Sequence, residues 1–569
     1  MDADRNRRGF WLDLVWLALW GVAGSIYCCS AASRLSATFD EPLYLQLGLE
    51  HWRTGSTFEL MRVGTMPMPV DVATAPVYFW ERWRGAPFDP VEDLDHILPV
   101  ARAGNLAFWW LLLIYGWIAA RRMGGPWAGR LAVAALACEP NLLAHSGLAT
   151  TDLAITAMLL AFCVHYRTGR EAGWLKRVGI PALCFAGALL AKASALAFVF
   201  ICMFAVDFER NWVGQSIDRF WPRILETMRA VFARSHRRDA VAMTGLAWLL
   251  VFIYCGCDWR AHPKFIAWAQ TLPEGAPRVA MVWFAEHLRI FNNAAVALLR
   301  QIQHNMQGHG SYLLGASTPR AFWYYFPVAL SIKTAVPILA APILVLLLRR
   351  RNLFNWACLA ALALLIFSLN CRVQIGIRMV LPLIALAVVG LSAALVRTAH
   401  EMWVPVRRAL GTAVCAGVAW MGASSVSVWP DGLRFTNEAW GGTSHGYLLL
   451  SDSNYDWGQG LKDLSRWQAR HHAGTIDVWY FGTDPASKRL PLCNLPIHAM
   501  PVQNTTELRE HLHGRYLAVG TTLLYGSYVV DASHAELLNE LRRRRPAGRT
   551  STFLIYDMNL PVAAADNSW

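Results

Sequence analysis

Residues 9–45 read "GFWLDLVWLALWGVAGSIYCCSAASRLSATFDEPLYL" and join a long apolar run to an adjacent pair of carboxylates, Asp40 and Glu41. The run is long enough to cross a bilayer, which needs about 20 apolar residues per helix. The two carboxylates follow shortly after it, where the chain would leave the membrane. The stretch therefore predicts a membrane-spanning first helix with an acidic pair at its exit.

The rest of the chain has the same apolar character. Its 569 residues are 55% hydrophobic and only 16% charged, and the mean hydropathy is +0.30. The apolar residues gather in runs that reach, or nearly reach, the length of a bilayer span. We therefore predict an α-helical polytopic membrane protein with about 11 transmembrane helices. The first run has no clean small-residue cleavage site, so we expect it to be retained.

The net charge of +13 is distributed between the apolar runs. Lys and Arg cluster at alternate turns, as they do in the short cytoplasmic loops of membrane proteins. This pattern indicates anchoring charge and argues against a nucleic-acid partner. It also predicts that the N-terminus is cytoplasmic.

The apolar runs divide the first part of the chain, residues 1–429, into a predicted transmembrane module. One run, 178–206, is too long for a single straight span, and "AKAS" at 191–194 interrupts it, so we divide it into two short helices. Two long polar stretches, 32–103 and 258–322, are expected on the extracytoplasmic side. The other expected spans are 10–31, 104–120, 127–144, 153–166, 241–257, 323–348, 353–370, 379–396 and 409–428.

Residues 430–569 differ from the rest of the chain in their pattern of apolar and polar residues. "HGYLLLSDS", "TIDVWYFG", "GRYLAVGTTLLYG" and "TSTFLIYDM" are typical of strands. "GLKDLSRWQARH" and "SHAELLNELRRR" between them are typical of amphipathic helices. This alternation predicts a small C-terminal α/β domain with a mainly parallel sheet, on the extracytoplasmic side.

Metal-binding patterns are weak in this sequence. The 12 cysteines are mostly scattered through apolar runs and form no CxxC-type framework. His304 and His309 are five residues apart, a poor spacing for a shared site on one helix. We therefore predict no metal site.

The first long polar stretch holds the acidic pair and further polar groups, among them Asp71. A carboxylate in a partly desolvated cleft at headgroup depth is suited to act as a general base. An Asp followed by Glu-Pro also suits the start of a helix. From spacing alone, Asp40 and Glu41 are equally well explained as a helix cap and as catalytic groups.

A second acidic element is "CEPNLLAHSGLATTDLAITAM", residues 138–158, in which His145 and Asp152 lie at an outer turn. An ionisable residue at membrane depth is a functional hypothesis by default. Asp152 is also suited to cap the next helix. The two roles are compatible.

Three isolated cations, Lys192, Lys333 and Arg378, lie at predicted outer helix ends and depart from the positive-inside pattern. If they converge, they can hold an anion such as a lipid phosphate. The alternative for each one alone is that its side chain reaches back to the interface.

The stretch "QHNMQGHGSYLLG", residues 303–315, is densely polar and follows an amphipathic segment. That segment is typical of a helix lying in the membrane interface. We predict that His309, Ser311 and Tyr312 contact substrate, with a solvated turn as the alternative.

Several of these pieces carry a family resemblance. "FDEPLYL", "TTDLA", "AKAS" and "IRMVLPLIAL" resemble GT-C glycosyltransferases of the family 39-like group, which contains protein O-mannosyltransferases and the aminoarabinose transferase of lipid A. "HGSYLLG", "YYFPVALSIKT", "WPDGLRFTNEAWGG" and "LSDSNYDWGQGLKDL" are similar to its bacterial phospholipid-carrier-dependent subgroup. The likeness covers nearly the whole chain. The β-trefoil insert of the eukaryotic enzymes is missing, so the resemblance does not identify the acceptor.

The resemblance implies an inverting enzyme of the bacterial cytoplasmic membrane. It would move a hexosyl or pentosyl group from a polyprenyl-phosphate donor to a hydroxyl of a glycan, lipid or protein on the extracytoplasmic face. Asp40 resembles the catalytic acid of the first loop, with Glu41 as its neighbour and Asp152 as the second acidic position. Lys192 and Arg378 match the cations near the lipid phosphate. No nucleotide, redox or metal cofactor is expected.

Two other functions compete with this interpretation. A polyprenyl-linked sugar transporter would also place charges at membrane depth, but transporters commonly show paired broken helices. The break at 191–194 has no clear counterpart elsewhere in the chain. A non-catalytic glycan-binding protein is the other alternative, and intact acidic and cationic positions count against it.

Overall fold

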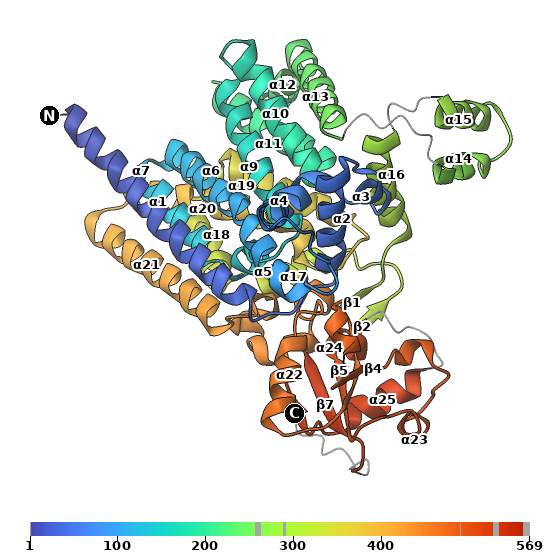
Figure 1. Cartoon of the computed structure of the whole chain (residues 1–569). Helices are drawn as coiled ribbons and strands as arrows, with labels where there is room; N and C mark the ends of the chain where they lie inside the picture. The colour runs from blue at the N-terminus through green and yellow to red at the C-terminus, as the bar shows by residue number, and fades with distance from the viewer. Residues whose placement is uncertain (1, 256–262, 288–291, 490, 527–533, 561–569) are drawn as a thin grey trace.

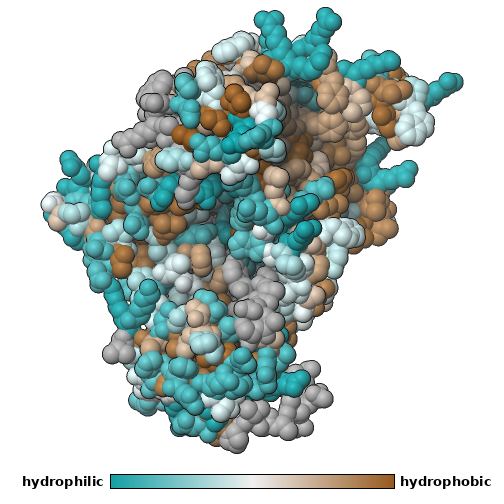
Figure 2. All heavy atoms as spheres, turned by 90° about the vertical axis from the view of Figure 1, so that its right-hand side faces the viewer, coloured by the Kyte–Doolittle hydropathy of each residue, from teal (hydrophilic) through white to brown (hydrophobic). Residues whose placement is uncertain are grey.

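The computed structural model describes residues 2–255, 263–287, 292–489, 491–526 and 534–560. A helical unit forms the upper part of the molecule in Figure 1, and a smaller unit with a β-sheet lies below it. We call these the helical unit and the sheet unit. On the face seen in Figure 2, hydrophobic residues gather over the upper part, whereas the lower part is mainly hydrophilic. This division agrees with a multi-pass membrane protein that carries a polar domain.

Each apolar run corresponds to one or two helices of the helical unit. The run 323–348 is divided between α17 and α18, and the predicted end of one span at residue 257 lies outside the described residues. The helices on the predicted spans are α1 (Asp2–Ala32), α6 (Leu106–Gly124), α7 (Pro126–Cys138), α8 (Pro140–Ser146), α9 (Asp152–Gly169), α10 (Ile180–Ala191), α11 (Ala195–Val213), α13 (Arg234–Tyr254), α17 (Tyr325–Lys333), α18 (Val336–Arg349), α19 (Trp356–Ser368), α20 (Leu381–His400) and α21 (Val404–Ser427).

Length and composition alone select fewer spans than the prediction. Among the described residues, four helical stretches are long and apolar enough to cross a membrane: Gly9–Ala32, Leu94–Gly124, Ile377–His400 and Val404–Ser427. A fifth arises if α17 and α18, bent by 107°, are one broken span. The other helices on predicted spans are shorter or more polar. Several are short because a break divides the predicted span into two helices.

The predicted interruption at 191–194 is confirmed. Helix α10 ends at Ala191, Lys192 adopts an extended backbone (φ −161°), and α11 begins at Ala195. The break lies at one end of both helices, so the Lys192 side chain is presented at a helix boundary rather than on a helix face.

The long polar stretches contain short helices. They are α2 (Glu41–Thr54), α3 (Phe58–Arg62), α4 (Pro67–Arg84), α5 (Leu94–Gly104), α14 (Pro263–Gln270), α15 (Ala276–His287) and α16 (Asn292–Gln307), with strands β1 (Ser311–Leu313) and β2 (Ala316–Thr318). Helix α12 (Phe220–Val231) follows α11 in the basic segment predicted to lie at the opposite membrane face.

The sheet unit contains a five-stranded sheet in the order β4-β3-β5-β7-β6. The pairs β4–β3 and β3–β5 are parallel, whereas β5–β7 and β7–β6 are antiparallel, so the sheet is mixed rather than mainly parallel. The elements are α22 (Leu461–Arg470), β3 (Ile476–Trp479), β4 (Leu492–Asn494), α23 (Thr505–Arg509), β5 (Tyr516–Gly520), α24 (Thr521–Tyr525), α25 (Ala535–Arg543), β6 (Gly548–Arg549) and β7 (Phe553–Asp557).

The strand predicted for "HGYLLLSDS", residues 445–453, is wrong. Residues Thr443–Leu448 form a 3₁₀ helix, and the segment after it lies along the helical unit instead of joining the sheet. The backbone N–H of Leu314 donates to the carbonyl of Leu449 (2.9 Å). The apolar character of this segment therefore reflects contact with the other unit.

The two units share a hydrophobic core. Leu148, from the turn before α9, clusters with Leu433, Trp457 and Trp479. Burial of such large side chains stabilises the contact between the units. The boundary at residue 430 stays a prediction, and the residues just after it run along the helical unit.

Candidate active site

A cavity of about 250 Å³ lies where the helical unit meets the sheet unit. Residues from α2, the α10–α11 break, the 3₁₀ helix Ile377–Val380 just before α20 and the segment after residue 450 line it. The groups used below are Asp40, Tyr44, Lys192, His304, His309, Arg378, Asp452 and Trp457. The cavity therefore collects polar groups from segments far apart in the sequence.

Carboxylates and cations alternate along one side of this cavity. Arg378 Nη1 lies 3.0 Å from Asp40 Oδ2 and 3.8 Å from Asp152 Oδ2. Lys192 Nζ lies 2.5 Å from Asp152 Oδ1. We call Asp40, Arg378, Asp152 and Lys192 the charged row. Opposite charges at these distances attract one another and hold the four side chains in position.

The two carboxylates of the row differ in accessibility. The Asp40 side chain is 24% exposed and lines the cavity, whereas the Asp152 side chain is fully buried behind it. Asp40 can therefore meet a substrate directly. Asp152 instead holds Lys192 and Arg378 in place from behind.

The Asp40 side chain does not cap helix α2. Asp40 occupies the N-cap position of α2, but its side chain makes no capping hydrogen bond. The backbone N–H of Thr38 donates to Glu41 Oε2 instead (2.8 Å). Asp152 likewise does not cap α9, since it is the first helical residue and its side chain pairs with Lys192.

Glu41 points away from the cavity, which corrects the prediction that it belongs with the catalytic groups. Arg102 donates to both of its oxygens, Nε to Oε1 at 2.9 Å and Nη2 to Oε2 at 2.7 Å. The backbone N–H of Ala149 adds a further bond at 2.8 Å. Burial alone would raise the pKa of Glu41, but the Arg102 charge and these hydrogen bonds hold it below its usual value. Glu41 thus fixes the start of α2, next to Asp40.

The segment "SDSN", residues 451–454, holds the loop that carries Arg378. The Ile377 N–H donates to Asn454 Oδ1 (3.0 Å), and the Ser453 hydroxyl donates to the Ile375 carbonyl. Gly376 has φ +128°, and a Cβ there would lie 2.1 Å from Ser453 Oγ. Only glycine permits this close approach.

Trp457 packs against the Arg378 guanidinium. The Arg378 Cζ lies 4.0 Å from the centroid of the Trp457 ring, a cation–π contact. Sequence reasoning did not select Trp457 as a site residue. The signal was the "LSDSNYDWGQG" stretch, which contains Trp457 and carries part of the family resemblance.

Asp452 is a further acidic group that sequence reasoning missed. It lines the cavity and adopts φ +57°, a conformation that non-glycine residues rarely take. Its N–H donates to Thr522 Oγ1 (2.9 Å) in the sheet unit. Backbone strain of this kind tends to gather at functional sites.

Two histidines lie on the cavity wall. The rings of His304 and His309 are 5.0 Å apart, and burial together with the nearby Arg378 charge lowers the pKa of each. Neutral imidazoles in this place can donate or accept hydrogen bonds from a polar ligand. The predicted contact role of His309 is consistent with its position.

The other predicted contact residues of that stretch do not line the cavity. The hydroxyl of Tyr312 donates to the Leu448 carbonyl (2.9 Å), and Ser311 is buried in strand β1. Tyr312 therefore supports the junction of the two units, and Ser311 lies in the interior away from the cavity wall.

Three more predicted site residues are also placed elsewhere. Lys333 is buried and donates to the Leu433 and Asn454 carbonyls (2.6 and 2.7 Å), so it joins the units instead of facing the cavity. Asp71 accepts from the Tyr254 hydroxyl (2.7 Å) and pairs with His51, outside the lining. His145 is buried and does not line the cavity. These placements correct the corresponding predictions.

The described residues contain one group with metal-ligand spacing, and it is not in this cavity. Asp477, Cys493 and His513 of the sheet unit offer ligand atoms within 4.8 Å of one another. Asp477 already accepts backbone hydrogen bonds from His513 (2.8 Å) and Gly514 (2.9 Å). In the charged row, each carboxylate is paired with a cationic side chain, Asp40 with Arg378 and Asp152 with Lys192.

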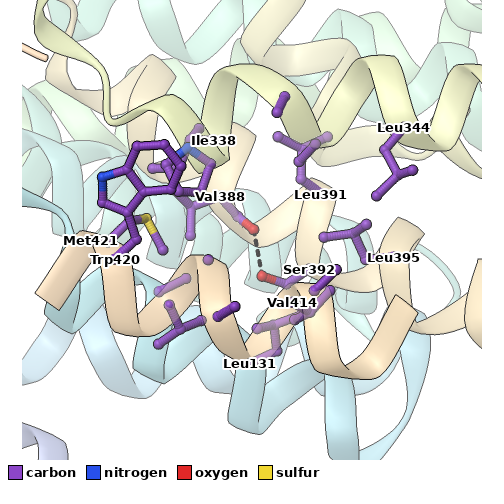
Figure 3. Close-up of a pocket in the computed structure, with 18 of the residues that line it drawn as sticks. Leu131, Ile338, Leu344, Val388, Leu391, Ser392, Leu395, Val414, Trp420 and Met421 are labelled. Carbon is purple, nitrogen blue, oxygen red and sulfur yellow. Dashed lines mark hydrogen bonds between the residues drawn. The ribbon is translucent and has the colours of Figure 1, made fainter. Parts of the chain in front are cut away.

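A second cavity, drawn in Figure 3, has a different character. It measures about 420 Å³ and lies between α7, α18, α20 and α21. Its lining is apolar apart from the Ser392 hydroxyl, which donates to the Val388 carbonyl (2.7 Å). Without an ionisable lining residue, it offers no acid or base for chemistry.

No protein-family model and no curated protein match the chain. Among solved structures, it is similar to the Archaeoglobus fulgidus oligosaccharyltransferase tethered to an acceptor peptide, at 10% identity and a TM-score of 0.45, over 97% of this chain and 75% of that one. The apo form of that enzyme is 12% identical with a TM-score of 0.44, over 95% of this chain and 74% of that one. ArnT from Cupriavidus metallidurans bound to undecaprenyl phosphate is 12% identical with a TM-score of 0.29, over 95% of this chain and 97% of that one.

Proposed function

We propose that the protein is a membrane glycosyltransferase that moves a sugar from a polyprenyl-phosphate donor to an acceptor hydroxyl, with inversion at the sugar carbon. The observation that carries this proposal is the charged row beside the cavity. One accessible carboxylate, Asp40, pairs with Arg378, and a second and buried carboxylate, Asp152, holds both Arg378 and Lys192 in place. This combination suits a reaction that removes a proton from one oxygen and adds charge to another.

Asp40 acts as the general base. As the acceptor oxygen forms its bond to the anomeric carbon, its proton passes to the Asp40 carboxylate. The 24% exposure of Asp40 leaves room for this contact. Glu41 cannot take this role, because both of its oxygens are occupied by Arg102 and backbone groups.

Arg378 and Lys192 stabilise the leaving group. The bond from the anomeric carbon to the phosphate oxygen breaks, and its electron pair stays on the phosphate. Arg378 Nε is buried and has no hydrogen-bond partner among the described residues, so a donor remains for this oxygen. A guanidinium can bind Asp40 and a phosphate at the same time.

The cavity size suggests what is transferred. Its volume of about 250 Å³ lies near the lower end of small-ligand pockets, which begin at about 300 Å³. It suits one sugar residue better than a long glycan. His304, His309 and Asp452 supply hydrogen-bonding groups for the sugar hydroxyls.

We place the cavity on the extracytoplasmic face of the bacterial cytoplasmic membrane. Basic side chains such as Arg167, Arg210 and Arg397 lie toward the other ends of α9, α11 and α20, which begin beside the cavity. The positive-inside rule assigns those ends to the cytoplasm. The N-terminus is then cytoplasmic and the sheet unit extracytoplasmic, and no nucleotide or redox cofactor is required.

The test is a transfer assay with purified protein in lipid, supplied with labelled polyprenyl-phosphate hexoses and pentoses. Asp40→Asn should lower turnover by about 10²- to 10⁴-fold, the usual contribution of a general base. Glu50→Gln, an exposed change on the same helix, is the matched control and should keep full activity. Full turnover of Asp40→Asn would contradict the assignment of the base.

A further inference from the structure

A third cavity, of about 490 Å³, lies at the far end of the helices that form the active site. Helix α9 begins at Asp152 in the charged row and ends beside this cavity. Its 18 residues span about 27 Å, close to the bilayer core of about 30 Å. The two cavities therefore open toward opposite faces of the membrane.

Five arginines from four helices line this cavity, which we call the basic cavity. Helix α6 contributes one, α9 and its C-cap two, α11 one and α20 one. They are Arg122, Arg167, Arg170, Arg210 and Arg397. The positive-inside rule explains arginines at helix ends, but it does not require them to line one cavity.

The acidic residues of the lining do not balance this charge. Glu209 pairs with Arg167 (3.3 Å), and Glu171 pairs with Arg210 (2.7 Å). The Arg122 side chain forms no ion pair or hydrogen bond with the described residues. The lining thus carries five cations against two carboxylates, and Asp239, outside the lining, pairs with Arg170.

Two guanidinium donors are also buried without a hydrogen-bond partner among the described residues. They are the Nε atoms of Arg167 and Arg170. The Arg170 side chain is only 3% exposed, and its Nη1 donates to Asp239 Oδ2 (3.2 Å). Its Nε lies 3.6 Å from Asp207 Oδ1, too far for a hydrogen bond. Buried donors of this kind are normally satisfied by a protein group, a water or a bound ion.

We propose that the basic cavity binds a phosphate group. The lining also includes the apolar side chains of Ala119, Met123, Val164 and Trp356, which suit the glycerol and acyl part of a phospholipid. Basic pockets between helices at the cytoplasmic face hold anionic head groups in this way. A soluble phosphate compound offers the same recognised chemistry.

The experiment uses the full-length protein, delipidated in detergent. Native mass spectrometry measures binding of phosphatidylglycerol and of phosphatidylethanolamine, and thermal unfolding measures stabilisation by inorganic phosphate. Because no sugar transfer is involved, the result is independent of the proposed activity. We expect phosphatidylglycerol to bind selectively, and the double variant Arg122→Gln/Arg210→Gln to weaken it by about 30-fold.

The matched control removes two exposed arginines from the start of α21, Arg407→Gln/Arg408→Gln, outside the basic cavity. It should bind phosphatidylglycerol like the unmodified protein. Stabilisation by inorganic phosphate that the cavity variant loses would identify a soluble phosphate compound as the occupant. Equal losses in the two variants would overturn the proposal. It would also fail if the unmodified protein did not prefer phosphatidylglycerol and was not stabilised by phosphate.

Discussion

Arg378 lies 3.0 Å from Asp40, although 338 positions separate the two residues in the chain. The contact joins the start of α2 to the 3₁₀ helix Ile377–Val380, which precedes α20. In the proposed mechanism, Arg378 is a cationic neighbour of the base and also binds the leaving phosphate. The predictions below follow from this pair and from the residues that hold it.

Replacing Arg378 tests whether its planar, forked donors are needed. Arg378→Lys keeps the positive charge but cannot contact Asp40, Asp152 and a phosphate at once. We expect kcat/KM to fall by about 10²-fold in the transfer assay, as when one stabilising donor is removed. Arg372→Lys, an exposed change in the same loop, is the control. Equal activities of the two variants would remove Arg378 from the mechanism.

The buried pair of Glu41 and Arg102 should contribute to stability rather than to chemistry. Glu41→Gln leaves the Arg102 charge buried without its partner, which typically costs about 3–5 kcal/mol. We expect a large fall in the thermal unfolding temperature, measured in detergent. Any protein that remains folded should keep near-normal turnover. Unchanged stability with lost turnover would instead return Glu41 to the catalytic groups.

The same pair predicts a loss of stability in acid. The folded-state pKa of Glu41 lies below its ordinary value, so its contribution is fully present above the unfolded pKa of about 4.3. It is lost as the pH falls below that value toward the folded pKa. As the pH is lowered from about 6 to about 3.5, the unfolding temperature should fall more steeply in the unmodified protein than in Glu41→Gln. Parallel curves would show that the pair is not the acid-sensitive element.

Asp456, next to Trp457, should give the opposite pH dependence. Burial raises its pKa to about 7, although Thr522 N–H (3.1 Å) and Gly458 N–H (3.2 Å) donate to it. A raised carboxyl pKa contributes stability below the unfolded value of about 3.9, and this contribution is lost as the pH rises through about 7. Unfolding temperature should therefore decline between about pH 4 and about pH 7 and level off above that. Asp456→Asn should remove this decline, and a decline of equal size in the variant would contradict the assignment.

The sequence predicted the elements of the site better than their partners. The "AKAS" break and the exit of the first span follow from local apolar length, and both lie where expected. The separate roles of Asp40 and Glu41 depend on Arg102, which is 61 positions away, so spacing could not assign them. Lys333 looked like an anion ligand because no carboxylate partner was evident near it in the sequence. Its actual partners are backbone carbonyls of a distant segment. Such contacts leave no pattern in composition or periodicity.

Gly376 tests whether the sheet unit positions Arg378. An alanine there is disfavoured by φ +128°, and its Cβ would lie 2.1 Å from Ser453 Oγ. The loop must then move away from "SDSN", which takes Arg378 off the Trp457 ring and away from Asp40. We expect Gly376→Ala to lose most transfer activity while the unfolding temperature changes little, because the helices on either side are unaltered.

A second variant separates the steric contact from the backbone strain. Gly376→Ala/Ser453→Gly removes the hydroxyl that the new Cβ would meet, but it leaves the unfavourable φ. Partial recovery of transfer in the double variant, measured against Ser453→Gly alone, would show that the contact between the units sets the position of Arg378. If Gly376→Ala kept full activity, the sheet unit would not be needed to hold the guanidinium, and its contact with this loop would serve stability alone.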